Sequence, residues 1–153
     1  MAPTANHVYW RAGFGPAPGT GSTTATDGAA AYRLLAASSS AQPPLQQYSV
    51  AEIAALERGS EERQRINREG TLRLNQSVLE RMAFGTAQLR EKAVLFWMDH
   101  FACKTPLYPL REHYYNTLHA GALGTFADLL HAVAKAPAML QFLNNQQNRK
   151  KAP

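Results

Sequence analysis

Large apolar residues recur at helical spacing in the second half of the chain. The clearest case lies between residues 86 and 103, where they return every three or four positions, the spacing of one helix face. We expect a helix here with a buried stripe and with Trp97 as a core anchor. Arg90, Glu91 and Asp99 fall outside this stripe. The stripe contains Leu89, Ala93, Phe96, Trp97, His100 and Phe101.

Weaker patterns predict helices on both sides of this one. Before it, a polar helical stretch reaches about residue 82, with a break or bend expected near Gly59 and Gly70 and exposed side chains over residues 57–70. After it, a helix marked by Tyr114 and Leu118 ends near residue 121. No segment alternates with the two-residue period of a strand.

Three helix starts carry local signals. Ser49 and Glu52 form a capping box, in which the hydroxyl accepts from the third backbone N–H while the carboxylate reaches back. Thr125 and Asp128 form a variant of the same motif. Pro137 suits the first turn of a last helix, because that position needs no N–H donor.

The first 48 residues form a loop-rich amino-terminal segment with short helices, expected near residues 6–12 and 28–37. Residues 13–28 are rich in glycine, proline, serine and threonine, and they read as a poorly ordered loop. The glycines suggest a phosphate-binding loop, but no Lys-Ser/Thr pair follows them. Pro16 and Pro18 also remove N–H donors that a phosphate would need.

Composition supports a single all-α domain over residues 1–153, an irregular multi-helix bundle whose helical core covers residues 49–153. Leucines number 17 against 7 for valine and isoleucine together, and unbranched side chains lose little freedom in a helix. Residues 71–153 hold 28 of the 42 large apolar side chains, so we expect most of the core to lie there.

The charge of the chain does not select a partner. The net charge is +5, but between residues 52 and 92 acidic and basic residues interleave as on a solvated helix face, so we expect no nucleic-acid binding. The first residues lack the basic and apolar regions of a secretory signal, and no window is apolar enough for a membrane span. The compartment is unknown, and the chain as written, without such a signal, is taken as cytoplasmic.

Several side chains offer metal-ligand atoms. Asp99, His100 and Cys103 are close in sequence, and His113, His119 and His131 follow on later helices, where some of them could converge on the same point. A structural role for His100 is favoured over metal binding. In that role it is a hydrogen-bonded core histidine beside Trp97. We therefore expect no metal and no cofactor.

The polar carboxyl-terminal segment, residues 144–153, offers a second kind of site. Its amide and guanidinium groups could bind an anion, or they could cap a helix whose dipole favours cations. His100, Asn148 and Arg149 are the candidate polar site. No nucleophile lies beside a base in any local motif, so the catalytic residues are unknown.

Three segments together resemble the bacterial domain-of-unknown-function 1800 family. They are residues 11–15 (RAGFG), residues 89–101 (LREKAVLFWMDHF) and the stretch from residue 128 through PAML at 137–140 to NRKKAP at 148–153. The resemblance implies a mostly helical fold and frequent export in other members, and it implies no reaction, substrate or cofactor. Members of that family continue beyond the segment that ends here, so the resemblance also implies an incomplete amino-terminal portion of a larger helical domain.

One departure from the family pattern concerns His100. Family members often have a second histidine two residues earlier, where this chain has Met98. Two hypotheses about function follow. The first is a non-catalytic or incomplete module, which could self-associate through uncovered apolar surface on the faces of Phe96, Phe126 or Phe142. The alternative is an enzyme of unknown type, with a site near His100 and Asn148–Arg149 completed by sequence beyond residue 153.

Overall fold

The structure is a computed structural model of the chain. It describes residues 3–16, 25–40, 42–46, 51, 53, 55–57 and 59–145. The capping box expected at Ser49 and Glu52 lies outside the described residues, as does most of the glycine-rich loop.

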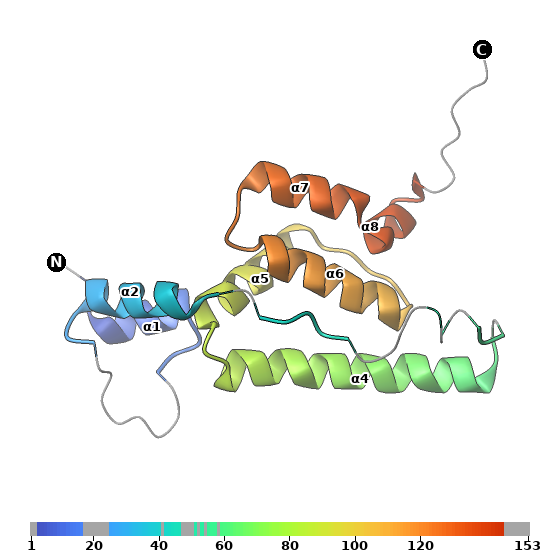
Figure 1. The fold of residues 1–153 in the computed structure, drawn as a ribbon, viewed down its shortest axis with the longest axis horizontal. Coiled ribbons are helices and arrows are strands. Elements are labelled where there is room, and N and C mark those ends of the chain that lie inside the picture. Colours follow the sequence, from blue (N-terminus) through green and yellow to red (C-terminus); the bar gives the residue numbers. More distant parts are fainter. Residues whose placement is uncertain are drawn as a thin grey trace, which may run out of the picture.

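The fold is all-α, as the sequence predicts, and no strand occurs in the described residues. Figure 1 shows the helices in chain order. The bounds are α1 Ala5–Ala12, α2 Gly28–Ser38, α4 Glu61–Phe84, α5 Gln88–His100, α6 Tyr108–Gly121, α7 Phe126–Lys135 and α8 Pro137–Phe142. None of the helices in the described part of the chain has the length and apolar character needed to span a bilayer.

Side-chain caps define where several helices begin. The Asp27 carboxylate accepts from the Ala30 N–H at the start of α2. The Thr125 hydroxyl accepts from the Asp128 N–H, which confirms the cap predicted for α7. Pro137 occupies the first turn of α8. These ends follow the sequence closely because a cap is a contact between residues three positions apart.

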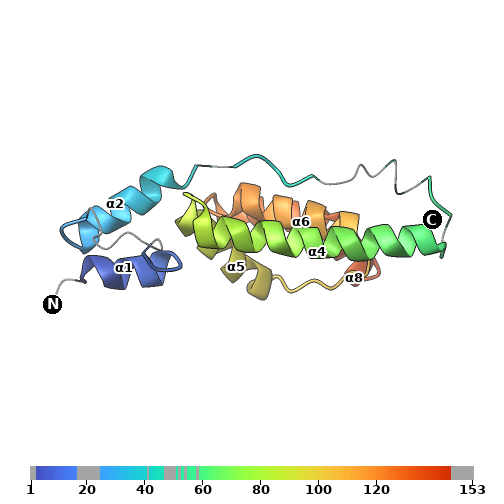
Figure 2. The same cartoon turned by 90° about the horizontal axis from the view of Figure 1, so that it is seen from below.

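The helices form a layered body with a small pair attached at one end. Helix α4 lies along one side, α5 and α6 lie in the middle, and α7 and α8 cover the opposite side (Figure 1). Helices α1 and α2 pack on each other beyond the first turns of α5 (Figure 2).

The main core cluster lies where α5 to α8 meet. Helix α6 is central to it, with Tyr114, Tyr115 and Leu118 all buried. A second cluster, Ile53, Leu74 and Tyr108, lies between α4 and the start of α6. The buried members of the main core cluster are Val94, Tyr114, Tyr115, Leu118, Ala122, Leu129, Val133, Ala136, Ala138 and Met139.

The prediction for the buried face of α5 is right only in part: Ala93, Trp97 and Phe101 are partly buried against the main core cluster, but the fully buried residues are different ones. The buried residues of α5 are Gln88, Glu91 and Val94, whereas Phe96 is 60% exposed and His100 is exposed. The spacing of apolar residues identifies one face of a helix, but it does not identify the element that packs against that face. Here the neighbour of the Glu91 face is α6, whose Tyr115 and His119 provide the hydrogen bonds that make a buried carboxylate possible.

Trp97 is half-buried and packs against the main core cluster. Its indole Nε1 donates to the Ala122 carbonyl oxygen at 3.0 Å. This bond ties α5 to the residue that follows α6. Trp97 is therefore a contact at the edge of the core, and its partial exposure differs from the fully buried stripe that the sequence predicts.

Helix α4 runs without a break through Gly70, so the bend predicted there is wrong, whereas the break predicted near Gly59 is confirmed, because α4 begins only at Glu61 and Gly59 has a φ of +88°. Gly70 is buried, and a Cβ there would lie 2.7 Å from the Tyr108 ring. The glycine therefore permits close approach of α4 and α6 rather than a kink. The expected exposure of residues 57–70 holds for many of them, and Arg65 forms exposed ion pairs with Glu62 and Glu69.

Phe14 lies in the turn that follows α1. Its ring is half-buried, and the Lys92 ammonium lies 4.9 Å from its centroid. Gly15 has a φ of +101°, and the Trp10 ring occupies the place where a Cβ would lie. The turn thus brings the aromatic ring back onto α5.

Gly70→Ala tests the close approach of α4 and α6. We expect a loss of about 1–3 kcal/mol in the free energy of unfolding, because the rigid Tyr108 ring cannot move aside. This loss outweighs the helix-propensity gain of about 1 kcal/mol for alanine over glycine. Denaturant unfolding measures the difference.

Gly121→Ala is the matched control. A Cβ at Gly121 would lie 2.8 Å from a methyl carbon at the end of the Leu129 side chain, which can rotate away. We expect a change of less than about 0.5 kcal/mol. Equal effects of the two substitutions would contradict the account of Gly70.

Candidate functional site

Of the three residues of the predicted polar site, His100 is the one that the structure describes. His100 is the last residue of α5 and is exposed. The expectation that it is a buried core histidine is therefore wrong, although its ring does lie 5.7 Å from that of Trp97. Asn148 and Arg149 lie outside the described residues, so this polar site stays a prediction.

The side chains considered as metal ligands are dispersed. Among the described residues, no three His, Cys, Asp or Glu side chains are grouped so that they could hold a metal ion. His119 is buried and bonded to a carboxylate, while His113 and His131 are exposed.

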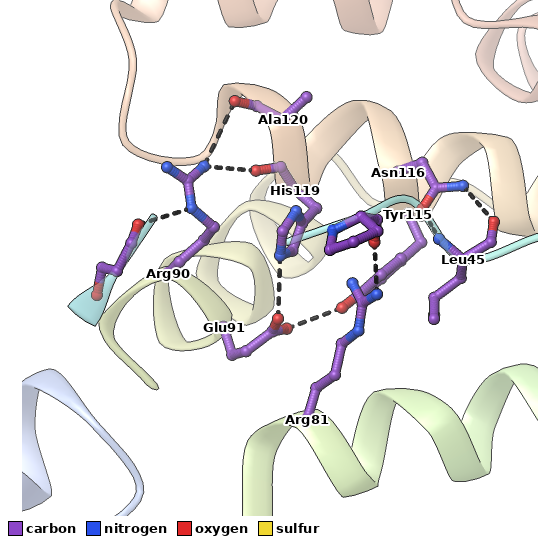
Figure 3. Close-up of polar contacts among 10 residues, drawn as sticks. Leu45, Arg81, Arg90, Glu91, Tyr115, Asn116, His119 and Ala120 are labelled. Atoms are coloured by element: carbon purple, nitrogen blue, oxygen red, sulfur yellow. Dashed lines mark hydrogen bonds and ion pairs between the residues drawn. The ribbon is translucent and has the colours of Figure 1, made fainter. Parts of the chain in front are cut away.

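A cluster of buried polar side chains joins α5 to α6, and it centres on Glu91. The carboxylate is completely buried. Its Oε2 accepts from the Tyr115 hydroxyl at 2.8 Å, and its Oε1 lies 3.1 Å from Nε2 of His119. Figure 3 shows both contacts. An N–H on the His119 nitrogen donates to the carboxylate, so each oxygen of Glu91 has a partner.

The electrostatics of this cluster hold a proton on Tyr115. Burial raises the pKa of the Tyr115 hydroxyl, and the hydrogen bond to Glu91 and the carboxylate charge raise it further. Arg81 lowers the pKa of Tyr115, through a hydrogen bond to the hydroxyl and through its positive charge, and its guanidinium lies 6.0 Å from the Tyr115 ring centroid. A tyrosine that stays protonated remains a hydrogen-bond donor to the carboxylate.

Residues 39–40 and 42–46, between α2 and α4, form an extended segment that we call the strap. Three helices bind its backbone (Figure 3). The Arg81 guanidinium donates to the Pro43 carbonyl at 2.6 Å, and the Arg90 Nε donates to the Ser39 carbonyl at 3.0 Å. The Asn116 amide pairs with both backbone groups of Leu45, at 2.7 and 2.9 Å.

Arg90 also closes the end of α6. Its Nη1 donates to the carbonyl oxygens of His119 and Ala120, at 2.7 and 3.4 Å. The last carbonyls of a helix have no partner within the helix. A cation there also interacts favourably with the negative end of the helix dipole. Arg90 thus joins α5, α6 and the strap.

The Glu91 cluster has the residue types of an acid–base site but not the access. Glu91, Tyr115 and His119 are at most 3% exposed, and both carboxylate oxygens are occupied. A general base must reach the proton that it removes from a substrate. We therefore assign the cluster a structural role.

Sequence reasoning missed this cluster. Glu91 and His119 are 28 residues apart on different helices, and no local motif connects them. A charged residue between the buried positions Gln88 and Val94 of α5 is the available signal, and it becomes informative only when the neighbour of that face is known.

Five rings of α5 and α7 form a continuous group that we call the aromatic surface. Phe126 lies 5.9 Å from Trp97 and 6.3 Å from Phe101, measured between ring centroids. Phe96 and His100 stack at 6.0 Å. Phe96 is 60% exposed and Phe126 is 53% exposed. The surface consists of Phe96, Trp97, His100, Phe101 and Phe126.

Comparison with known proteins agrees with the sequence resemblance. A family model described as "Protein of unknown function (DUF1800)" matches residues 7–153. No curated protein and no solved structure matches the chain.

Glu91→Ala tests the buried cluster. We expect a loss of about 3–5 kcal/mol in unfolding free energy, because the substitution leaves His119 and Tyr115 buried without their acceptor. Glu91→Gln keeps the shape and one acceptor, so its loss should be smaller, about 1–3 kcal/mol. Denaturant titration with far-ultraviolet circular dichroism measures both.

Glu80→Ala is the control for these substitutions. Glu80 lies on α4 and is exposed, so its removal should change the free energy by less than about 0.5 kcal/mol. A loss for Glu91→Ala as small as this would show that the buried carboxylate does not hold α5 and α6 together.

The raised pKa of Tyr115 predicts a loss of stability in alkali. The unfolded chain releases this proton near the ordinary pKa of 10.0, whereas the folded chain keeps it to higher pH. The stability that the folded chain gains by keeping the Tyr115 proton is therefore fully present below pH 10.0, and it is lost as the pH rises above that value. Burial also raises the pKa of Tyr114, to about 12.

Tyr115→Phe isolates the contribution of Tyr115. Above about pH 10, the wild-type chain should lose roughly 1.4 kcal/mol more per pH unit than the variant, which has no proton to release. The test follows the unfolding free energy of both chains from about pH 9 to about pH 12, a range that includes the ordinary tyrosine pKa. The same dependence on pH in both chains would refute this assignment.

Proposed function

The chain belongs to the DUF1800 family, whose description assigns no activity, and we propose that it is a non-catalytic helical module that self-associates through the aromatic surface. The observation that carries this proposal is the exposure of Phe96 and Phe126 within one continuous group of rings.

The character of these rings supports an interface. Monomeric proteins rarely expose large contiguous apolar patches, and aromatic residues are enriched at the centres of protein interfaces. Phe142 and Leu143 are also about half exposed, at 46% and 55%. They lie at the end of α8, past the end of α7 that is remote from Phe126, so they are apolar area apart from the aromatic surface.

A second copy of the chain fits this surface in two respects. The five side chains include no carboxylate, lysine or arginine, so the rings themselves bring no fixed charges of like sign together. A symmetric pair also uses each ring twice, which doubles the effect of every contact.

Phe96→Ser and Phe126→Ser test the proposal. We expect the wild-type chain to dimerise with rising concentration in sedimentation or light scattering, and to bind a hydrophobic dye when it is monomeric. Each substitution should weaken the dimer by roughly 30-fold or more, the equivalent of about 2 kcal/mol for a central aromatic contact.

Phe84→Ser is the matched control. Phe84 is 76% exposed at the end of α4 and has no part in the aromatic surface, so its loss should leave association unchanged. A wild-type chain that stays monomeric with a cooperative melt and no dye binding would overturn the proposal. An equal effect of Phe84→Ser would overturn it as well.

A further inference from the structure

A groove of about 530 Å³ lies between α4 on one side and α5 and α6 on the other. It is separate from the aromatic surface, because the α5 residues that line it are Leu95 and Met98. This volume falls in the range of roughly 300–1,000 Å³ that is typical of small-molecule sites. The other residues that line it are Leu74, Asn75, Val78, Leu79, Met82, Cys103, Lys104, Thr105, Arg111, Tyr114 and Tyr115.

The walls of the groove are mostly aliphatic and open to solvent. Leu79 is 63% exposed, Leu95 is 44% exposed and Met98 is 40% exposed. Met82 lines the same wall. Methionine side chains are flexible and polarisable, so they adapt to an irregular apolar ligand. The groove thus offers a surface for a flexible hydrocarbon chain.

One end of the groove is positively charged. Lys104 and Arg111 line it, whereas no Asp or Glu does. Arg111 Nε donates to the Thr105 carbonyl at 2.6 Å, so its guanidinium is held beside the residue that follows Lys104. The Arg111 guanidinium and the Lys104 backbone therefore lie at the same end of the groove. Lys104 is exposed, and within the described residues its ammonium has no hydrogen-bond partner.

We propose that this groove binds a long-chain carboxylate, with the hydrocarbon along the wall of α4 and α5 and the carboxylate between Lys104 and Arg111. The apolar wall supplies the driving force through burial of the chain. The cations fix its direction, because hydrogen bonds between charged partners are stronger than neutral ones. A cationic amphiphile with the same tail would meet repulsion at that end.

Cys103 provides a reporter inside the groove. It is the single cysteine of the chain, it lines the groove, and it is partly accessible. Burial raises the pKa of its thiol, so alkylation by iodoacetamide is slow and easily followed. A hydrocarbon chain in the groove covers the thiol and slows the reaction further.

The test measures Cys103 alkylation with and without hexadecanoate below its micelle concentration. We expect protection of roughly 5-fold or more at saturation, since the bound chain excludes the reagent. Butanoate has the head without the tail and should not protect. Hexadecyltrimethylammonium has the tail with the opposite charge and should bind at least about 10-fold more weakly.

Two charge reversals locate the carboxylate. Lys104→Glu should weaken hexadecanoate binding by about 10-fold or more in calorimetry. Lys135→Glu makes the same change of net charge on α7, on a residue that does not line the groove, and should change it little. Circular dichroism verifies that both variants are folded.

Phe96→Ser keeps the groove intact, so it should leave hexadecanoate binding unchanged whether or not the chain dimerises. The two proposals therefore fail independently. Absence of protection by hexadecanoate would overturn the groove proposal. Equal protection by the cationic amphiphile would also overturn it, as would equal effects of Lys104→Glu and Lys135→Glu.

Discussion

The Glu91 carboxylate is the constraint on which the arrangement of the helices depends. A buried carboxylate is tolerated only where hydrogen-bond donors replace water. Tyr115 and His119 provide those donors from a single face of α6. Once α5 presents Glu91 to α6, the rotation of α5 about its own axis is fixed. The aromatic residues of α5 must then face α7, which covers them only in part.

The strap extends the same network to the amino-terminal helices. Arg81, Arg90 and Asn116 come from three different helices, and each binds a backbone carbonyl of the strap. Pro43 and Pro44 restrict this segment to extended conformations, so less conformational entropy is lost when it binds. The strap is therefore held mainly by polar contacts from side chains whose own helices are fixed by the core.

Local chemistry is what the sequence could reveal. The caps at Asp27 and Thr125 and the proline at the start of α8 depend on residues a few positions apart, and the helical periodicity is equally local. The all-α class and the family therefore followed from the sequence. The buried face of α5 did not, because the partners of Glu91 lie on α6 and no pattern within α5 refers to them.

Gly70 and His100 both show that sequence spacing cannot predict which residue of another helix lies beside a given position. A glycine within a polar helix suggests a bend, and only the position of the Tyr108 ring shows that it is a contact point. A histidine within an apolar stripe suggests burial. His100 is exposed because α7 covers that face of α5 only in part. The deciding neighbour is 38 residues from Gly70 (108 − 70) and at least 26 residues from His100 (126 − 100), beyond the reach of helical spacing.

The way the strap is attached determines which part of the molecule opens most easily. Leu45 is the strap's half-buried aliphatic anchor among the described residues, and its other attachments are hydrogen bonds from the ends of long side chains. Free energies of local opening are low where few apolar contacts must be broken. We therefore expect the strap to open more readily than the packed helices α4 to α8. Amide protons of the strap should then exchange faster than those of α4 to α8, whose exchange requires opening of the core.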